Sequence, residues 1–282
     1  MNNCDTAGED CSPSIKIFSL VVSIPHPHCV PSNGPTLIEA SFNGGHVLKQ
    51  IDNAIQLGDI ATAHLADACL RVRVLLRCAP HEMRPAVAGM KTSGRARPVR
   101  HVGSVDVFLE AIEVASQGDI LVVDNDGRFD ESCIGDLVVR EAKLAGLGGI
   151  VIWGLHRDSL EVSEIALPLF SLGVTSAGPQ RLDNRPPDVF ENAFVGKHRV
   201  TAGDIVVADG DGVIFLPQGR TGELIVAAAA IREVERNQAL GMANGKSLRD
   251  QLGFKEYLAQ RQRDSQYSFR QHLRQIGGAI EE

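Results

Sequence analysis

The stretch GDLVVREAKLAGLGGIVIWGLHRD, residues 135–158, decides the fold, because it holds a helix and a buried strand in direct succession. Residues 135–144 predict a helix, and the glycines of AGLGG suit the turn that ends it. IVIWG, residues 150–154, is a short continuous apolar run of the kind that lies buried on both faces of a sheet. GDILVVD, residues 118–124, is a second strand of this type. Buried strands that alternate with helices predict an α/β fold with a partly parallel sheet.

Three parts of the chain can be distinguished around this stretch. Prolines every few residues forbid a regular helix at the N-terminus, so residues 1–40 are expected to form an irregular arm. Residues 41–220 are expected to form the α/β domain, and residues 221–282 a helical extension. Further helices are expected at 36–57, 59–76, 105–117, 221–240 and 248–276, and further strands within 87–99 and at 168–173, 192–194, 204–208 and 213–216.

Composition excludes several classes of protein. The chain of 282 residues has a formal net charge of −7, which argues against a general nucleic-acid binder. Its six scattered cysteines have no zinc-ligand spacing and are expected to be free thiols in a reducing compartment. The apolar run at residues 15–24 is too short to span a membrane and follows acidic residues, so no membrane segment is expected and a cytoplasmic protein is predicted.

Residues 135–158 also hold the strongest candidate site. A helix begins at Gly135-Asp136, and Arg157-Asp158 follows the carboxyl end of a strand, which is where ligands bind in open α/β sheets. The first turn of a helix suits a carboxylate. Asp158 and Asp136 offer hard oxygen ligands for Mg²⁺ or Mn²⁺, which would chelate a small 2-oxo acid. Arg157 and the metal would then stabilise the enolate left by carbon–carbon cleavage.

Simpler interpretations exist for the same residues. An Arg-Asp pair at a strand end is often a surface ion pair, and a polar residue at a helix start is often a cap. AGLGG follows a helix and precedes a strand, the reverse of a dinucleotide-binding fingerprint. His156 is expected to be structural more often than catalytic, and Cys133 has no visible paired base, so a reactive thiol is not expected.

The spacing of these residues resembles a known family. Asp136, twenty intervening residues and Arg157-Asp158 match the D-x20-R-D pattern of the class II pyruvate aldolases, typified by 4-hydroxy-4-methyl-2-oxoglutarate/4-carboxy-4-hydroxy-2-oxoadipate aldolase. These enzymes belong with the regulator of ribonuclease activity A-like (RraA-like) proteins. The likeness covers roughly residues 50–240 and includes IATAHLADACL (60–70) and VTAGDIVVADGDGVIFLP (200–217). It implies a swivelling β/β/α sandwich, assembled as a homotrimer or hexamer with the site at a subunit interface.

The resemblance also implies roles for individual residues. Asp158 would bind the metal directly and Asp136 through water, while Arg157 contacts the keto or enolate oxygen. The helix start at Gly135, with the backbone N–H groups of Asp136, Leu137 and Val138, would hold the substrate carboxylate.

Other positions depart from the family pattern. The aldolases carry a His-Glu-Ala in the entry helix, where this chain has His64-Leu65-Ala66-Asp67, so the acid is displaced to Asp67. A second acid, lent by the C-terminal helix, corresponds to Glu233 or Glu235. Trp153 and His156 replace the small or acidic residues usual before Arg-Asp, which leaves room for a different substrate.

Together these features predict a metal-dependent lyase that cleaves a 4-hydroxy-2-oxo acid to pyruvate, with oxaloacetate decarboxylation as a side activity. The alternative is a non-catalytic regulator that binds a partner enzyme such as a ribonuclease. The regulators lack the first aspartate of the motif, so Asp136 favours the enzyme. Other enolate chemistry, such as dehydration of a sugar acid, is a third alternative.

Overall fold

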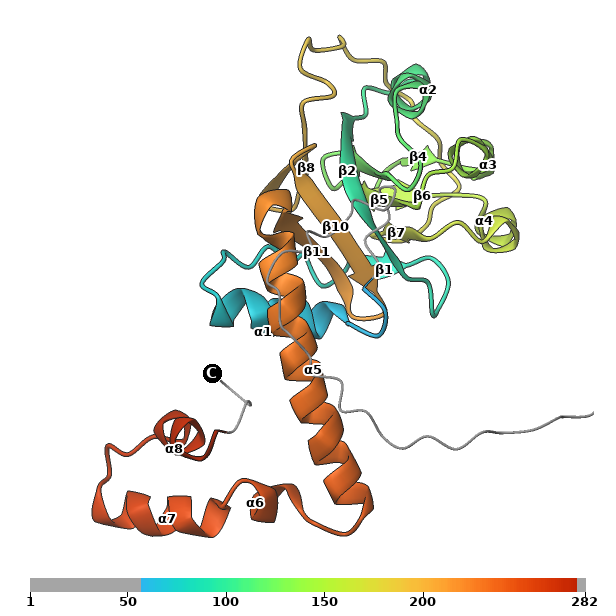
Figure 1. Ribbon diagram of the computed structural model, residues 1–282. Helices are drawn as coiled ribbons and strands as arrows, with labels where there is room; N and C mark the ends of the chain where they lie inside the picture. Colours follow the sequence, from blue (N-terminus) through green and yellow to red (C-terminus); the bar gives the residue numbers. More distant parts are fainter. Residues whose placement is uncertain (1–56, 278–282) are drawn as a thin grey trace, which may run out of the picture. The chain divides into compact units, whose positions relative to one another are not determined.

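The computed structural model describes residues 57–277 (Figure 1). The expected N-terminal arm, the apolar run at 15–24 and the helix expected at 36–57, apart from its last residue, lie outside them. The helices are α1 (Thr62–Arg71), α2 (Asp106–Glu113), α3 (Asp136–Leu144), α4 (Ser159–Ile165), α5 (Thr221–Ala243), α6 (Leu248–Gln251), α7 (Phe254–Arg263) and α8 (Phe269–Ile276), with a 3₁₀ turn at Gln218–Arg220. The strands are β1 (Arg84–Pro85), β2 (Thr92–Arg100), β3 (Ile120–Asp124), β4 (Ser132–Ile134), β5 (Gly149–Trp153), β6 (Leu155–His156), β7 (Leu169–Ser171), β8 (Asn192–Val195), β9 (His198–Thr201), β10 (Asp204–Asp209) and β11 (Gly212–Pro217).

A seven-stranded mixed sheet organises the chain, in the order β1-β7-β5-β3-β2-β10-β11. Its middle strands β7, β5, β3 and β2 run parallel, as the buried apolar strands predict, while β1, β10 and β11 pair antiparallel with their neighbours. A short parallel pair, β4 with β6, and the hairpin β8–β9 form two further small sheets. The α/β class with a partly parallel sheet is therefore confirmed.

Three hydrophobic cores hold these layers together. The first lies between one face of the parallel strands and helices α2, α3 and α4, and includes Phe108, Leu121 and Ile152. The opposite face packs against the β8–β9 hairpin and includes Val122, Phe170 and Phe215. The third joins β10 and β11 to α1 and α5 (Figure 1). The sheet thus has helices packed on one face and the β8–β9 hairpin packed on the other. This is the swivelling β/β/α arrangement that the resemblance implies.

The helical extension after β11 is present but differs in detail. One amphipathic helix over 248–276 was expected, and this is wrong, because three short helices occupy the segment. Gly253 has a φ of 55° and separates α6 from α7, while Asp264 is extended and ends α7. Ser268 then caps α8 by accepting a hydrogen bond from the Gln271 N–H. The helix expected at 59–76 is likewise shorter, since Arg73 takes a φ of 57°.

An aromatic cluster joins α7 to α8, and a hydrogen bond from α8 reaches the residue that ends α6. Phe254, Tyr257, Phe269 and His272 pack within it, with the Tyr257 and Phe269 ring centroids 4.9 Å apart. His272 also hydrogen-bonds the Leu252 carbonyl through Nε2, at 2.8 Å. Within residues 57–277, none of the helices has the length and apolar character needed to cross a membrane.

Candidate active site

Two short strands bring the predicted site residues together. β4 ends where Gly135 begins the turn into α3, and β6 ends at the Arg157-Asp158 turn into α4. β4 and β6 pair in parallel, and the Arg157 N–H donates to the Ile134 carbonyl at 3.0 Å. The start of α3 and the Arg-Asp pair are therefore neighbours at one edge of the fold, as the strand-end rule predicts.

Asp158 is the centre of this group. Its backbone is left-handed, with φ 60° and ψ 48°, a conformation that Asp tolerates better than most residues. Its Oδ2 atom accepts a hydrogen bond from the Asp136 N–H at 3.2 Å and lies 3.4 Å from Arg157 Nε. The side chain is 35% exposed, so its carboxylate remains open to solvent and to a ligand.

Asp136 lies at the first position of α3, with its side chain 24% exposed. Its carboxylate pairs with Arg140 one turn later, at 3.3 Å from Oδ2 to Nε. Its backbone N–H was expected to hold the substrate carboxylate, but in this structure it donates to Asp158. The N–H groups of Leu137 and Val138, also in the first turn, have no partner inside the helix and remain suited to an anion.

Gly135 is required by close packing rather than by backbone conformation. Its φ of −122° is accessible to any residue. A Cβ atom at this position would lie 2.3 Å from Asp158 Oδ2 and 3.0 Å from Arg157 Nε. Gly178 makes a similar approach, because its Cβ would lie 2.9 Å from Arg157 Nη1. Two glycines therefore make room for the Arg-Asp pair.

A cavity of about 340 Å³ opens beside the Arg-Asp pair. It is lined by Arg157, Asp158, Ser159, Val174, Thr175 and Ser176. The last three come from the loop after β7, which pairs with β6 through a bridge between His156 and Val174. Sequence reasoning missed this loop, although its place at the carboxyl end of a buried strand was a usable signal.

A buried ionic network lies beyond this loop and was also missed. Glu131, whose side chain is 4% exposed, accepts a hydrogen bond from Arg181 Nε at 3.0 Å. Arg181 also donates to Asn125 Oδ1 at 3.0 Å, and His101 Nδ1 lies 2.9 Å from the same oxygen. Arg128 Nε lies 3.5 Å from the same Glu131 oxygen, Oε1. Asn125 is 24 positions from His101, and Arg181 is 50 positions from Glu131 and 80 from His101. No local sequence pattern predicts contacts over such separations.

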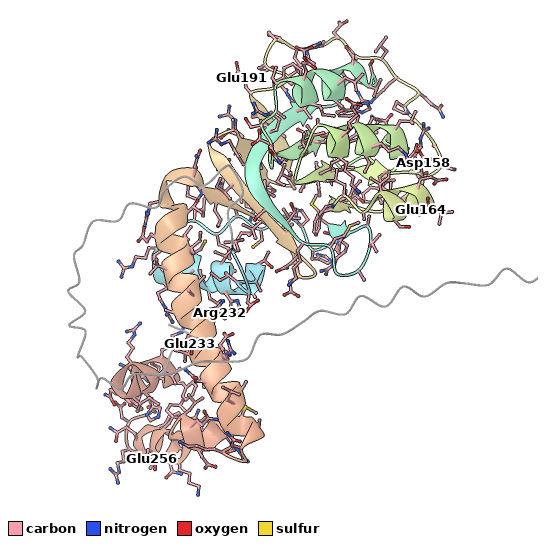
Figure 2. The ribbon with its side chains drawn as sticks, turned by 45° about the vertical axis from the view of Figure 1, so that its right-hand side comes forward. Asp158, Glu164, Glu191, Arg232, Glu233 and Glu256 are labelled. Carbon is pink, nitrogen blue, oxygen red and sulfur yellow. The ribbon has the colours of Figure 1, made fainter. Side chains whose placement is uncertain are left out.

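The two proposed extra acids lie elsewhere in the chain. Asp67 is exposed on α1, and Glu233 is exposed on α5, where it accepts a hydrogen bond from Asn237. Figure 2 shows Glu233 on α5 and Asp158 at the start of α4, on separate elements. Glu235, the other candidate, faces His64 Nε2 at 3.2 Å. Within residues 57–277, no hydrogen bond or ion pair links these acids to Asp158.

The two other side chains considered near the site, His156 and Cys133, are both buried. His156 is 3% exposed, and its Nδ1 lies 2.8 Å from Ser171 Oγ; burial lowers its pKa. Cys133 is buried, and burial raises the pKa of its thiol, so no reactive thiolate is expected. These positions agree with the structural interpretation of both residues.

The donor chemistry around Asp158 fits a hard cation. Within residues 57–277, no group of three or more His, Cys, Asp or Glu side chains is arranged to hold a metal ion. Asp158 and Asp136 each provide a partly exposed carboxylate, and the Asp136 N–H donates to the Asp158 carboxylate. Mg²⁺ is typically held by one or two carboxylates, with water and substrate oxygens as further ligands. A site of this kind is consistent with what the two aspartates offer.

Comparison with known proteins finds relatives over the α/β part of the chain. The RraA-like family (Aldolase/RraA) matches residues 62–215, more than half of the chain. A protein of Halalkalibacterium halodurans, provisionally named a 4-hydroxy-4-methyl-2-oxoglutarate aldolase, is 27% identical over 205 residues, which cover 72% of this chain and 91% of that protein. The 4-hydroxy-4-methyl-2-oxoglutarate aldolase of Thermus thermophilus is 28% identical over 130 residues, which cover 46% of this chain and 78% of that enzyme.

One solved structure with a similar fold is described as a member of an inhibitor family and not as an aldolase. RraAS2 of Streptomyces coelicolor, described as an unusual member of the RNase ES inhibitor RraA protein family, superposes with a TM-score of 0.56 at 26% identity. The match covers 63% of this chain and 90% of RraAS2. The relatives therefore include both aldolases and a member of an inhibitor family.

Proposed function

Because this chain belongs to the RraA-like (Aldolase/RraA) family, we propose that it is a divalent-metal-dependent lyase that cleaves a 4-hydroxy-2-oxo acid to pyruvate. The relatives named as aldolases support a lyase in general terms. The observation that carries the finer proposal is the convergence of Asp136, Arg157 and Asp158, with the Asp158 carboxylate 3.2 Å from the Asp136 N–H. A metal ion held by carboxylates, together with a guanidinium at the same point, can stabilise the negative charge of an enolate.

Each residue has a defined task in this proposal. Asp158 and Asp136 would hold Mg²⁺ or Mn²⁺, and the cation when bound supplies positive charge that stabilises a developing enolate. Arg157 places its guanidinium beside the keto oxygen, where a planar fork can donate two hydrogen bonds. The N–H groups of Leu137 and Val138 orient the substrate carboxylate at the start of α3.

The proposal includes an assembly. We expect a homotrimer or hexamer in which a neighbouring subunit lends Asp67, Glu233 or Glu235 to the site, because within one chain these acids belong to α1 and α5. A decarboxylation of oxaloacetate is expected as a side activity, since loss of CO₂ leaves the same enolate of pyruvate.

Pyruvate release from oxaloacetate tests the proposal directly. The purified protein is assayed with Mg²⁺ or Mn²⁺ and again with EDTA, and a protein-free sample gives the rate due to the free metal ion. We expect release well above that background, lost with EDTA and lost in Asp158→Ala, whose circular dichroism spectrum should remain that of the wild type. Turnover retained in Asp158→Ala would remove Asp158 from the mechanism.

The second candidate is a regulator that binds a partner enzyme, and it is favoured by the likeness to RraAS2. Saturable binding to a ribonuclease in the presence of EDTA, together with no metal-dependent pyruvate release, would support this function in place of the lyase.

A further inference from the structure

The cavity beside the Arg-Asp pair is rich in hydroxyl groups. Three of its six lining residues, Ser159, Thr175 and Ser176, carry a hydroxyl, and Val174 is the one apolar member. Arg157 and Asp158 form its charged end. A substrate held by its 2-oxo acid end at Arg157 would extend its tail along these hydroxyls.

The loop that carries two of these hydroxyls is tied down on both sides. The Thr175 N–H donates to the His156 carbonyl at 3.0 Å. The Ala177 carbonyl accepts from the Ser132 N–H at 2.7 Å and from the Ser132 Oγ at 2.8 Å. Further along, Arg181 anchors the same loop to buried Glu131. Hydroxyls on a wall that is already ordered lose little entropy when they bind a ligand, so they can contribute to selectivity.

The charges around the cavity disfavour a second carboxylate on the substrate. Among the described residues that line it, Arg157 is the one cation, and the proposed chemistry assigns it to the keto oxygen. The guanidinium of Arg181, further along the same loop, is paired with Glu131 and Asp183, and that of Arg128 is paired with Asp130. A tail carboxylate would therefore lie along a wall of hydroxyls without a cation of its own, and this is unfavourable in a partly enclosed site.

We propose that this cavity selects 4-hydroxy-2-oxo acids whose tail is hydroxylated and uncharged, with Thr175 and Ser176 hydrogen-bonded to the tail hydroxyls. The inference rests on the proposed lyase function. In the reaction, the C3–C4 bond breaks and its electron pair forms the enolate of pyruvate, which then takes up a proton at C3. The 4-hydroxyl loses its proton and becomes the carbonyl of a hydroxyaldehyde. No oxidant, reductant or water is consumed.

Two substrates of equal length test this selectivity. 4,5-Dihydroxy-2-oxopentanoate and 4-hydroxy-2-oxoglutarate share the reacting end and differ at C5, which is an alcohol in the first and a carboxylate in the second. Pyruvate release is followed with lactate dehydrogenase in the presence of Mg²⁺. We expect kcat/KM for the dihydroxy acid to exceed that for the dicarboxylate by at least about tenfold, which is the size of one well-made hydrogen bond.

Variants assign the preference to the wall. Thr175→Val combined with Ser176→Ala should lower the ratio of the two kcat/KM values about tenfold, and Ser176→Arg should raise turnover of the dicarboxylate by about tenfold or more. Ser163→Ala is the matched control, because Ser163 is an exposed hydroxyl of α4 outside the cavity. Its ratio should equal that of the wild type.

The oxaloacetate assay separates the two levels of the proposal. Metal-dependent turnover of oxaloacetate with equal or better use of the dicarboxylate, or with no use of either hydroxy acid, would overturn the tail selectivity while the lyase function stands. No metal-dependent turnover of any of the three substrates would remove the lyase function and this inference with it.

Discussion

Gly135→Ala should separate the chemistry of the site from the stability of the fold. The added Cβ would lie 2.3 Å from Asp158 Oδ2, where ordinary contacts begin at 3.4 Å. The carboxylate must therefore retreat by about 1 Å, and a displacement of that size costs on the order of a hundredfold in rate. The backbone at position 135 is extended, with φ −122°, so alanine adds no strain of its own. The clash falls on the end of a partly exposed side chain, which can move without disturbing a core.

Two measurements follow from this reasoning. kcat/KM for pyruvate release should fall about a hundredfold, and Mn²⁺ affinity, measured by calorimetry without substrate, should fall as well. The melting temperature should stay close to that of the wild type. Gly219→Ala is the control, because its Cβ would meet nothing within 4 Å. Wild-type kcat/KM and Mn²⁺ affinity in Gly135→Ala would refute the argument that Asp158 must hold its position against Gly135.

Three further changes probe the charged groups. Arg157→Lys should reduce kcat/KM at least about tenfold at unchanged stability, because a point charge cannot replace a planar fork; an enzyme of wild-type activity would contradict its placement at the keto oxygen. Burial lowers the pKa of His156 below its ordinary value of 6.5. As pH falls through this range, the unfolded chain binds more protons than the folded chain, so the free energy of unfolding falls. In His156→Asn, the free energy of unfolding measured by urea titration should depend less on pH between about pH 7 and pH 5. The same pH dependence as in the wild type would contradict this contribution of His156. Arg181→Ala leaves buried Glu131 without its closest cation and should cost about 3–5 kcal/mol of unfolding free energy. Arg185→Ala, which removes an exposed pair with Glu110, should cost no more than about 1 kcal/mol, and equal losses would contradict the importance of burial.

Sequence patterns were sufficient for the parts of the fold that depend on local periodicity. The continuous apolar runs of β3 and β5 predict buried parallel strands, and the residues that follow such strands predict where a site forms. The proximity of Asp136 to Asp158 follows from those two rules, although 22 positions separate them.

Other features had no local signature. β4 and β6 have three and two residues, too few for a periodic pattern, yet their pairing aligns the two halves of the site. Arg181 and Glu131 are 50 positions apart, and their contact depends on how the loop after β7 folds back. The single helix expected over 248–276 failed for a different reason. Its charged amphipathic pattern is locally helical in each piece, and the left-handed Gly253 decides where one piece stops.

The left-handed backbone of Asp158 limits which amino-acid substitutions position 158 can accept during evolution. Glycine, asparagine and aspartate adopt a left-handed backbone conformation at a lower free-energy cost than most other residues. In the genetic code, both asparagine and glycine are one nucleotide away from aspartate. Position 158 can therefore lose its carboxylate in a single mutational step while the chain still makes the same turn into α4. A single base change can therefore remove the carboxylate that the proposed lyase requires and leave the fold intact.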